Sequence, residues 1–245
     1  MQVPVRAAEI HSHRFGLEPY PANFSCEVHL LAESSQRILI WFNQLNIPDV
    51  DPLCENVLHC FNTNTPYSEG MAEAGGQTGL CKKTYPRQPL VSSQHYFTFT
   101  FRSKPDKLTP AMLEDPSAGF RLTVAAVTEP QRRGPVCPPA AKLEQSGSVR
   151  NSKSSASDQE SILRLCRFLP AKPMNIGSGN GGDEASSSKS HRQRRQIDAA
   201  TPSLMVSWCL PKEALCDGVV HCPNGADERS ELCLLLGQRD GQDGD

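Results

Sequence analysis

Alternation of apolar and polar positions predicts several short β-strands in the first half of the chain. Residues 95–103, HYFTFTFRS, place phenylalanines on one face and threonines on the other, which is the period of two expected of a strand. Residues 119–127, GFRLTVAAV, alternate in the same way, and residues 37–47, RILIWFNQLNI, do so with a local change of phase. Polar, turn-rich stretches separate these segments, so we expect a mainly β protein with an antiparallel β-sandwich.

The apolar periodicity is lost after the last of these strands. Residues 129–202 are rich in Ser, Gly, Lys and Arg, and we expect a long disordered linker there. A short amphipathic segment, residues 161–170, interrupts this stretch and predicts a short piece of helix. Residues 203–233 form a compact cysteine cluster, and we expect residues 1–15 to be an N-terminal tail and residues 234–245 a polar C-terminal tail.

The cysteine content indicates where the protein works. The chain has ten cysteines at scattered positions and no CxxC pair. An even number with this spacing indicates disulfides and an oxidising compartment, so we expect an extracellular protein or the ectodomain of a membrane protein. The N-terminal residues lack the apolar core of a signal peptide, and no apolar run is long enough to cross a bilayer. The net charge of −2 gives no reason to expect nucleic-acid binding.

Five short motifs between residues 16 and 128 occur in the order typical of CUB domains, and this region resembles that family. YPANFSC at residues 20–26 is similar to the YPxNxxC opening, and GLCKKTYP around Cys81 is similar to the LCGxxxP segment. The other three motifs are residues 37–47 and the segments FTFTFRS and GFRLTV. The resemblance implies an extracellular β-sandwich that binds other proteins. It also implies a Cys54–Cys81 disulfide, worth roughly 3–4 kcal/mol on the loop-entropy account.

This CUB-like region departs from the family at its cysteines and at its calcium positions. The usual cysteine upstream of the opening motif is absent, so we expect Cys26 to lack its ordinary partner and the N-terminal edge to be truncated. Cys60 stands where an inward-facing aliphatic residue is usual, and we expect a buried free thiol, with a disulfide as the alternative. The family's calcium positions correspond to Asn46, the Asn56–Val57 region and Lys104. Because calcium needs charged oxygen ligands, we expect no calcium here.

Residues 209–233 resemble the second half of an LDL-receptor class A repeat. The family's cysteines, glycines and acidic residues occur in the same order: Cys209, Cys216, Asp217, Gly218, Cys222, Gly225, Asp227, Glu228 and Cys233. The interval 167–208 contains no cysteine, although the first half of the repeat would place two there. We therefore expect a partial class A-like repeat over residues 203–233.

The class A resemblance implies one disulfide and leaves others open. The family pairing would join Cys216 to Cys233 but leaves the neighbouring cysteines without their partners. These could pair with each other or with upstream cysteines, and the sequence does not decide between the arrangements. The cysteines concerned are Cys209 and Cys222, with Cys137 and Cys166 upstream.

In class A repeats, carboxylates and two backbone carbonyls surround one calcium ion. Carried over to this chain, the ligands are Asp217, Asp227 and Glu228, with the carbonyls of Ala214 and Val219. The fourth carboxylate of the family is replaced by His221, and imidazole is a poor calcium ligand. Because the number of charged ligands tunes calcium affinity, we expect a weak or absent site.

Two motifs indicate covalent modification. RQRR, with Arg192, Arg194 and Arg195, resembles the cleavage site of furin-type proprotein convertases, and a solvated basic run is the alternative. Cleavage after Arg195 would separate the two modules unless a disulfide joins them. Asn23 begins an Asn-Phe-Ser sequon for N-glycosylation.

These features favour a non-catalytic extracellular protein-binding module, or a fragment of a modular receptor ectodomain similar to those of neuropilin- and tolloid-like receptors. The partners would be extracellular or membrane-receptor proteins. The sequence has no GxSxG, HExxH, Walker or GxGxxG pattern, so we expect no enzyme. Two alternatives remain: the non-catalytic region of a secreted modular protease, and a truncated product without function.

Overall fold

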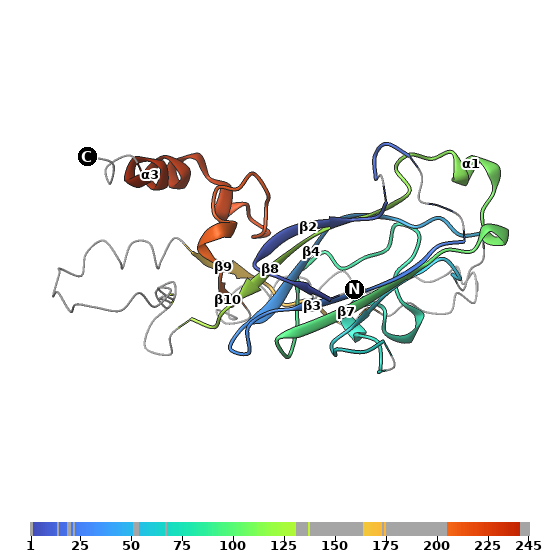
Figure 1. Cartoon of the computed structure of the whole chain (residues 1–245), viewed down its shortest axis with the longest axis horizontal. Helices are drawn as coiled ribbons and strands as arrows, with labels where there is room; N and C mark the ends of the chain where they lie inside the picture. The colour runs from blue at the N-terminus through green and yellow to red at the C-terminus, as the bar shows by residue number, and fades with distance from the viewer. Residues whose placement is uncertain are drawn as a thin grey trace, which may run out of the picture.

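The computed structural model describes most of the first 130 residues and several later stretches. The described residues are 2–13, 15–18, 21, 23–50, 54–66, 68–130, 137, 164–172, 174 and 205–240. They form two four-stranded sheets, a two-stranded ribbon and short helices (Figure 1). Most of the stretch expected to be a disordered linker lies outside the described residues.

Two mainly antiparallel sheets make up the sandwich. The first sheet has the strand order β1-β3-β7-β5 and the second has the order β2-β8-β4-β6. All neighbouring strands run antiparallel except β1 and β3, which are parallel. The strands are β1 (Gln2–Pro4), β2 (Ala7–His11), β3 (Ser25–Leu31), β4 (Arg37–Asn46), β5 (Val57–Phe61), β6 (Leu90–Val91), β7 (Tyr96–Arg102) and β8 (Gly119–Val127). The expected mainly β class and antiparallel sandwich are confirmed.

The core between the sheets follows the alternation in the sequence. Phe97, Phe99 and Phe101 on β7 are all buried. The Phe120 ring on β8 meets Phe99 and Phe101 edge-on, with ring centroids 6.1 and 5.4 Å apart. The change of phase in β4 is a register shift between Phe42 and Gln44, which keeps the apolar residues on both sides of the shift facing the core.

The N-terminal residues differ from the expected tail. Residues 2–11 form β1 and β2, each of which adds an edge strand to one of the two sheets. Val5, between these strands, is buried in the core, and Ala8 and Ile10 pack against it from β2. The apolar positions in this stretch are too few to predict a strand by themselves, and the partner strands supply the hydrogen bonds that order them.

A two-stranded ribbon forms from residues far apart in the sequence. Strand β9 (Leu165–Phe168) pairs antiparallel with β10 (Val206–Cys209). The expectation of a short helix at residues 161–170 was therefore wrong for residues 165–168. Cys166 and Phe168 alternate onto one buried face of the ribbon, which satisfies the apolar pattern with a period of two.

Short helices fill the connections. They are the 3-10 turns Ala72–Ala74, Gly76–Thr78, Pro105–Lys107, Lys212–Ala214 and Ala226–Glu228, and the α-helices α1 (Pro110–Leu113) and α3 (Ser230–Asp240). In the part of the chain that the structure describes, no helix has the length and apolar character needed to cross a membrane.

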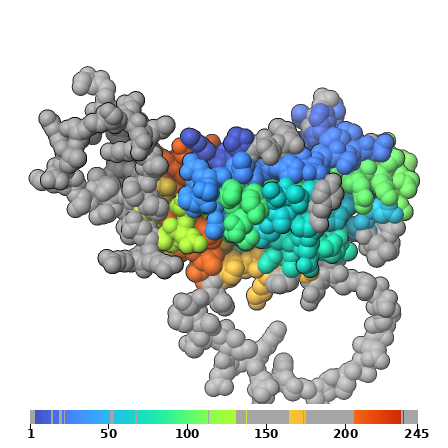
Figure 2. All heavy atoms as spheres, turned by 60° about the horizontal axis from the view of Figure 1, so that its bottom comes forward, coloured from blue at the N-terminus to red at the C-terminus, as the bar shows by residue number. Residues whose placement is uncertain are grey.

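The later residues fold against the sandwich. We call residues 137, 164–172 and 205–240 the C-terminal module. Leu39, Ala125 and Val127 point away from the sandwich core, because their neighbours along β4 and β8 belong to that core. They form a second apolar cluster with residues of the C-terminal module: Cys166, Phe168, Leu210, Ala214, Leu215, Cys222 and Leu232. Strand β8 is therefore buried on both faces. In Figure 2 the yellow-green end of this part of the chain lies against the orange residues of the module.

Backbone hydrogen bonds continue this contact at the end of β8. The Thr128 N–H donates to the Cys209 carbonyl at 3.0 Å, and the Cys209 N–H donates to the Thr128 carbonyl at 2.8 Å. The Thr123 hydroxyl donates to the Val220 carbonyl at 3.2 Å. These bonds fix the register of the module on the sheet.

Leu39→Ala tests whether this outward face is a true core. We expect the free energy of unfolding to fall by about 2–5 kcal/mol, because the side chain is buried and its removal leaves a cavity. Urea denaturation measures the change. Leu31→Ala, at a leucine that is 43% exposed, is the control, and we expect a change within about 0.5 kcal/mol. Equal small effects of the two substitutions would show that the module does not cover the sheet.

Candidate metal centre and disulfide framework

Four disulfides join described cysteines. Cys54–Cys81 closes a separation of 27 residues within the sandwich, and Cys216–Cys233 closes one of 17 residues in the C-terminal module. These are the two pairs that the family resemblances implied. The other two bonds are Cys137–Cys209 and Cys166–Cys222, with Cα–Cα distances of 5.5 and 5.6 Å.

The last two bonds decide the arrangement that the sequence left open. Cys209 and Cys222 do not pair with each other, and each reaches a cysteine upstream of the interval 167–208. Pairing of β9 with β10 places Cys166 opposite Trp208, beside Cys209. The C-terminal module thus includes Cys137 and Cys166, which were expected to lie in the linker. These cysteines are far upstream of their partners in the sequence.

Two cysteines carry free thiols. Cys60 is buried in the sandwich core, and desolvation raises its pKa to about 12. Burial also raises the pKa of the half-buried Cys26, although a backbone hydrogen bond from Phe101 acts in the opposite direction. Neither thiol is therefore activated as a nucleophile.

We call residues 217–228 of the C-terminal module the acidic loop. Asp217 and His221 form its central contact. Asp217 Oδ2 lies 3.0 Å from His221 Nε2, and Asp217 Oδ1 accepts a hydrogen bond from the Val219 N–H at 2.9 Å. The imidazole is only 1% exposed, and its Nδ1 has no hydrogen-bond partner. The buried ring therefore occupies one carboxylate oxygen of the candidate ligand set.

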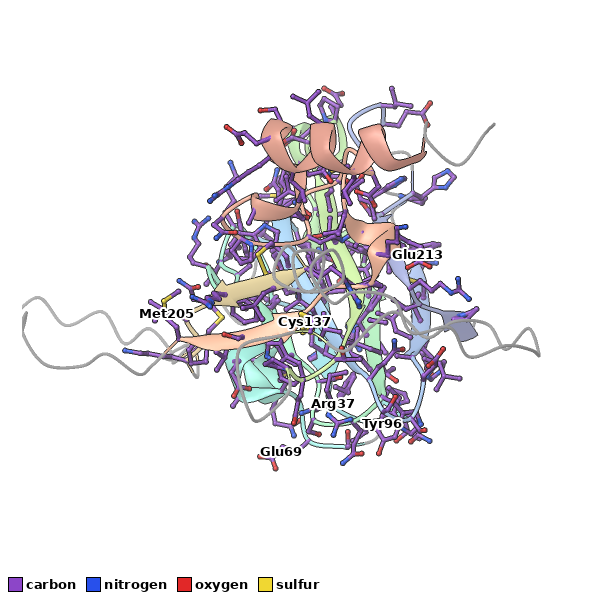
Figure 3. All side chains as sticks on the ribbon, turned by 90° about the vertical axis from the view of Figure 1, so that its left-hand side faces the viewer. Arg37, Glu69, Tyr96, Cys137, Met205 and Glu213 are labelled. Carbon is purple, nitrogen blue, oxygen red and sulfur yellow. A yellow bond between two sulfur atoms is a disulfide. The ribbon has the colours of Figure 1, made fainter. Side chains whose placement is uncertain are left out.

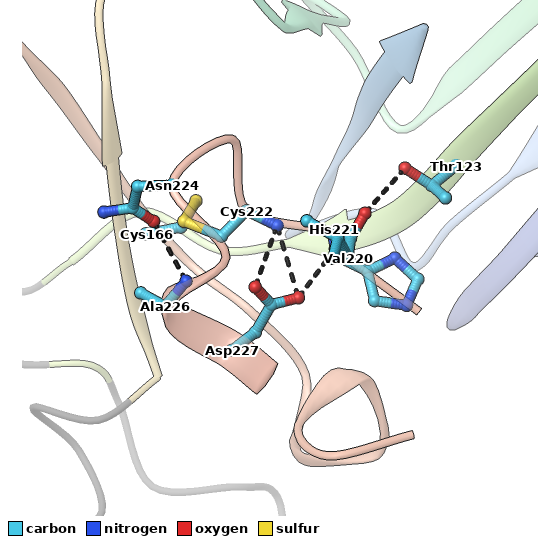
Figure 4. The surroundings of a disulfide bond; sticks show 8 residues. All are labelled: Thr123, Cys166, Val220, His221, Cys222, Asn224, Ala226 and Asp227. Atoms are coloured by element: carbon cyan, nitrogen blue, oxygen red, sulfur yellow. Dashed lines mark hydrogen bonds between the residues drawn. A yellow bond between two sulfur atoms is a disulfide. The ribbon is translucent and has the colours of Figure 1, made fainter. Parts of the chain in front are cut away.

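Backbone donors occupy the other two candidate carboxylates. Asp227 Oδ2 accepts from the His221 N–H at 2.6 Å, and both Asp227 oxygens lie within 3.3 Å of the Cys222 N–H (Figure 4). Glu228 accepts from the N–H groups of Asp217 and Gly218, both at 3.0 Å. Burial raises the pKa of Asp227, whereas its backbone hydrogen bonds act to lower it.

These contacts do not fit a calcium cage. Calcium takes six or more oxygen ligands, but here imidazole and N–H groups already bind the carboxylate oxygens. Ala214, a candidate carbonyl ligand, is fully buried in the apolar cluster against the sandwich. No group of three or more His, Cys, Asp or Glu side chains is placed to hold a metal ion among the residues that the structure describes.

The residues at the positions that the CUB resemblance assigned to calcium form an ion pair and hydrogen bonds with neighbouring residues. Lys104 forms an ion pair with Glu55, and its backbone N–H donates to the Asn56 side-chain oxygen. Asn46 Nδ2 donates to Asp115 Oδ2 at 3.1 Å and to Ser117 Oγ at 2.9 Å. Lys104 thus places a positive charge beside Glu55, at one of the positions that the CUB resemblance of the sequence assigned to calcium.

Sequence reasoning missed several members of this network. Asp49 Oδ2 accepts from the Glu55 N–H at 2.7 Å and from the Asn56 N–H at 2.6 Å. Lys107 Nζ lies 3.4 Å from Glu55 Oε1. Asp115 Oδ1 accepts hydrogen bonds from the backbone N–H and the hydroxyl of Ser117. These residues belong to loops that meet only in the folded chain, and no local pattern marked them.

Of the two modification motifs, the structure describes the glycosylation sequon and not the RQRR motif. Asn23 is exposed and has a positive φ of 58°, a conformation that asparagine tolerates well. The exposed Ser25 begins β3 two residues later. Arg192, Arg194 and Arg195 lie outside the described residues.

Comparisons with known proteins found structural likeness alone. No family model matches the chain, and neither does any curated protein. The CUB1-EGF-CUB2 region of human MASP-1/3 is 19% identical, with 51% of this chain and 41% of that chain covered and a TM-score of 0.39. The corresponding region of rat MASP-1 is 15% identical, with 56% and 48% covered and a TM-score of 0.41. The chain thus spans less than half the length of these two structures.

A third structure is a single domain, the MASP-1 CUB2 domain bound to Ca²⁺. It is 19% identical, with 51% of this chain and 96% of that chain covered and a TM-score of 0.39. These TM-scores are too low to establish a common fold. The sandwich is therefore described by its own strands, and CUB domains are what it is similar to.

His221→Asp tests why the acidic loop is a poor calcium site. The substitution removes the imidazole from Asp217 and restores a fourth carboxylate, so we expect calcium affinity to rise at least about tenfold because ligand charge tunes such sites. Calorimetric titration of the whole protein measures the change. His221→Asn removes the ring without adding charge and should gain far less. Equal affinity of wild type and His221→Asp would refute this explanation.

Glu55→Gln tests the lysine-centred network through its pH dependence. The hydrogen bond from Lys104 is the largest cause that lowers the pKa of Glu55 from its ordinary 4.5. The folded state therefore binds fewer protons than the unfolded state around that pH. The ionised Glu55 carboxylate therefore stabilises the fold above about pH 4.5, and this stabilisation is lost as the pH falls through the pKa of Glu55 in the folded state.

We expect Glu55→Gln to unfold more easily at pH 7 and to lose less stability between pH 7 and acid pH than wild type. Urea denaturation at a series of pH values measures both effects. Glu114→Gln, at an exposed carboxylate, is the control and should follow wild type. If the stability of Glu55→Gln depended on pH in the same way as that of wild type, Glu55 would not be the source of this pH dependence.

Proposed function

We propose that this chain is a non-catalytic extracellular protein-binding module, or a fragment of a modular receptor ectodomain. The observation that carries the proposal is the disulfide framework of the C-terminal module. Its three disulfides draw on cysteines from widely separated positions, and such bonds persist only in an oxidising compartment. Small, disulfide-rich modules joined to β-sandwiches are typical of proteins that bind other proteins outside the cell.

The covered face of the sandwich limits where a partner can bind. The outward side of sheet β2-β8-β4-β6 contacts the C-terminal module. The Val220 carbonyl of the acidic loop is bound by Thr123 of that sheet, so this part of the loop faces the sandwich. We place the partner surface on the loops at the ends of the sandwich and on the other sheet, β1-β3-β7-β5.

Metal ions have a minor part in this function. The acidic loop binds calcium weakly or not at all, since His221 and backbone N–H groups take its carboxylate oxygens. The CUB-like positions take no calcium, since Lys104 supplies the positive charge there. Binding to a partner should therefore persist when calcium is chelated.

Cleavage after Arg195 would leave two chains that remain joined. Cys137 and Cys166 precede this position, and their partners Cys209 and Cys222 follow it. Processing by a furin-type convertase would thus change the connectivity of the protein without releasing the C-terminal module. The two chains would separate only after reduction.

A secreted form of the chain tests the proposal. The chain is expressed in mammalian cells behind an added signal peptide, its disulfides are mapped by mass spectrometry, and the labelled protein is added to intact cells. We expect the four disulfides of the structure, and saturable surface binding that unlabelled protein competes away and chelation of calcium leaves intact. Convertase-treated protein should run as one species on non-reducing gels and as two after reduction.

Matched cysteine variants make the test specific. Cys166→Ser should reduce secretion several-fold, because loss of a native disulfide from a small module costs about 2–5 kcal/mol. Cys60→Ala, at a free thiol, should be secreted like wild type. Mostly reduced cysteines in the secreted protein, or surface binding that does not saturate, would rule out the proposed function.

A further inference from the structure

The acidic loop contains an asparagine followed by a glycine. Asn224 is exposed, and Gly225 follows it with a φ of 61° and open space where a side chain would stand. In such a pair the backbone nitrogen of the glycine can attack the side-chain carbonyl carbon of the asparagine, because glycine has no side chain to obstruct it. The amide nitrogen leaves as ammonia, and a succinimide ring forms. Water opens this ring and leaves aspartate or isoaspartate, so Asn224 is a candidate deamidation site.

A hydrogen-bonded turn holds the glycine nitrogen of this pair. The Gly225 N–H donates to the Cys222 carbonyl at 2.8 Å, which closes a β-turn. Pro223 is the second residue of the turn, and its ring sets a φ of about −65° there. Asn224 is the third residue, and it is not among the non-glycine residues with positive φ in the described part of the chain. A type II turn requires a positive φ at that position, so this turn is type I.

The turn opposes deamidation in two ways. The attacking nitrogen must lose its proton, and the hydrogen bond to Cys222 stabilises the N–H. The backbone of Asn224 must also rotate until its Cβ and the Gly225 nitrogen are nearly eclipsed, and a type I turn does not contain that rotation. The Ala226 N–H donates to Asn224 Oδ1 at 3.1 Å, which polarises the side-chain carbonyl and favours attack (Figure 4). Protection of Asn224 therefore depends on the backbone turn and not on its side chain.

The Cys166–Cys222 disulfide fixes one end of the turn. Cys222 is fully buried, and its sulfur is bonded to that of Cys166 in strand β9 (Figure 4). Its N–H lies 3.2 and 3.3 Å from the two carboxylate oxygens of Asp227. The residue whose carbonyl holds the Gly225 N–H is thus anchored through both its side chain and its backbone. Loss of the disulfide would remove the side-chain anchor and leave the turn with hydrogen bonds alone.

We propose that the Cys166–Cys222 disulfide controls deamidation of Asn224. While the bond is intact, the turn keeps its hydrogen bond and Asn224 is protected. A dithiol reductant converts the bond to two thiols and is itself oxidised to a disulfide. The turn then opens, the Gly225 nitrogen attacks, and ammonia leaves with the proton of the Gly225 N–H. The new carboxylate adds a negative charge that the acidic loop keeps after the disulfide has formed again. This inference does not depend on the protein-binding function proposed above.

Graded reduction of the full chain tests the proposal. The protein is incubated with increasing amounts of dithiothreitol at mildly alkaline pH, and its free thiols are then alkylated with iodoacetamide. The remaining disulfides are reduced and labelled with N-ethylmaleimide. Trypsin cleaves after Lys212 and Arg229, so one peptide carries Cys216, Cys222 and Asn224. Mass spectrometry of this peptide reports reduction and deamidation on the same molecule.

Cys216 is the control within the same peptide. It is half-buried, whereas Cys222 is fully buried, so mild reduction should open Cys216–Cys233 before Cys166–Cys222. We expect deamidation of Asn224 to be at least about fivefold more frequent in peptides alkylated at Cys222 than in those alkylated at Cys216 alone, because the turn has lost its anchor. Equal frequencies would overturn the proposal. Deamidation of the unreduced protein as fast as that of the reduced chain unfolded in guanidinium would overturn it as well.

Paired cysteine variants separate this disulfide from a general loosening of the module. Cys166→Ala/Cys222→Ala should deamidate at Asn224 at least about fivefold faster than wild type. Cys137→Ala/Cys209→Ala removes another disulfide of the module, at the ribbon where Figure 3 labels Cys137, and should deamidate like wild type. Equal acceleration in the two variants would assign the effect to loosening of the whole module and overturn the proposal. The graded reduction uses the wild-type chain and does not depend on the folding of these variants.

Discussion

The apolar contact between sheet β2-β8-β4-β6 and the C-terminal module determines how the two parts of the chain are arranged. None of the four disulfides among the described residues joins this module to the sandwich, since Cys54–Cys81 lies within one part and the other three lie within the other. Apolar burial at Leu39 and Val127 and the backbone hydrogen bonds between Thr128 and Cys209 therefore hold the two parts together. Apolar burial is the largest favourable term in folding. The contact also turns the acidic loop toward the sandwich, since the Thr123 hydroxyl bonds to the Val220 carbonyl.

At both places that the sequence resemblances assigned to calcium, groups of the protein itself contact the candidate ligands. In the acidic loop, an imidazole and backbone N–H groups bind the carboxylates, and in the sandwich a lysine ammonium pairs with Glu55. In each case a fixed donor takes the place of a diffusible cation. These contacts link the loop residues to one another directly, through hydrogen bonds and ion pairs.

The strands with strong alternation were predictable, and the weaker ones were not. Residues 95–103 and 119–127 alternate so regularly that one face must be buried, and both form long strands of the sandwich. Residues 2–11 and 165–168 carry too few apolar positions to outweigh other conformations. They become strands because a partner strand completes their hydrogen bonds, and that partner is distant in sequence. The candidate ligands were likewise predictable by position, but not the donors that occupy them.

The β-rich class, the alternation that builds the sandwich core and the histidine at position 221 could all be read from the chain. These are local properties, because periodicity and residue chemistry act over a few positions. The folded structure was needed to show that Cys137 and Cys166 complete the C-terminal module and that the module covers a sheet face. Each of these depends on which distant surfaces meet, and burial of apolar area selects those surfaces without leaving a local mark in the chain.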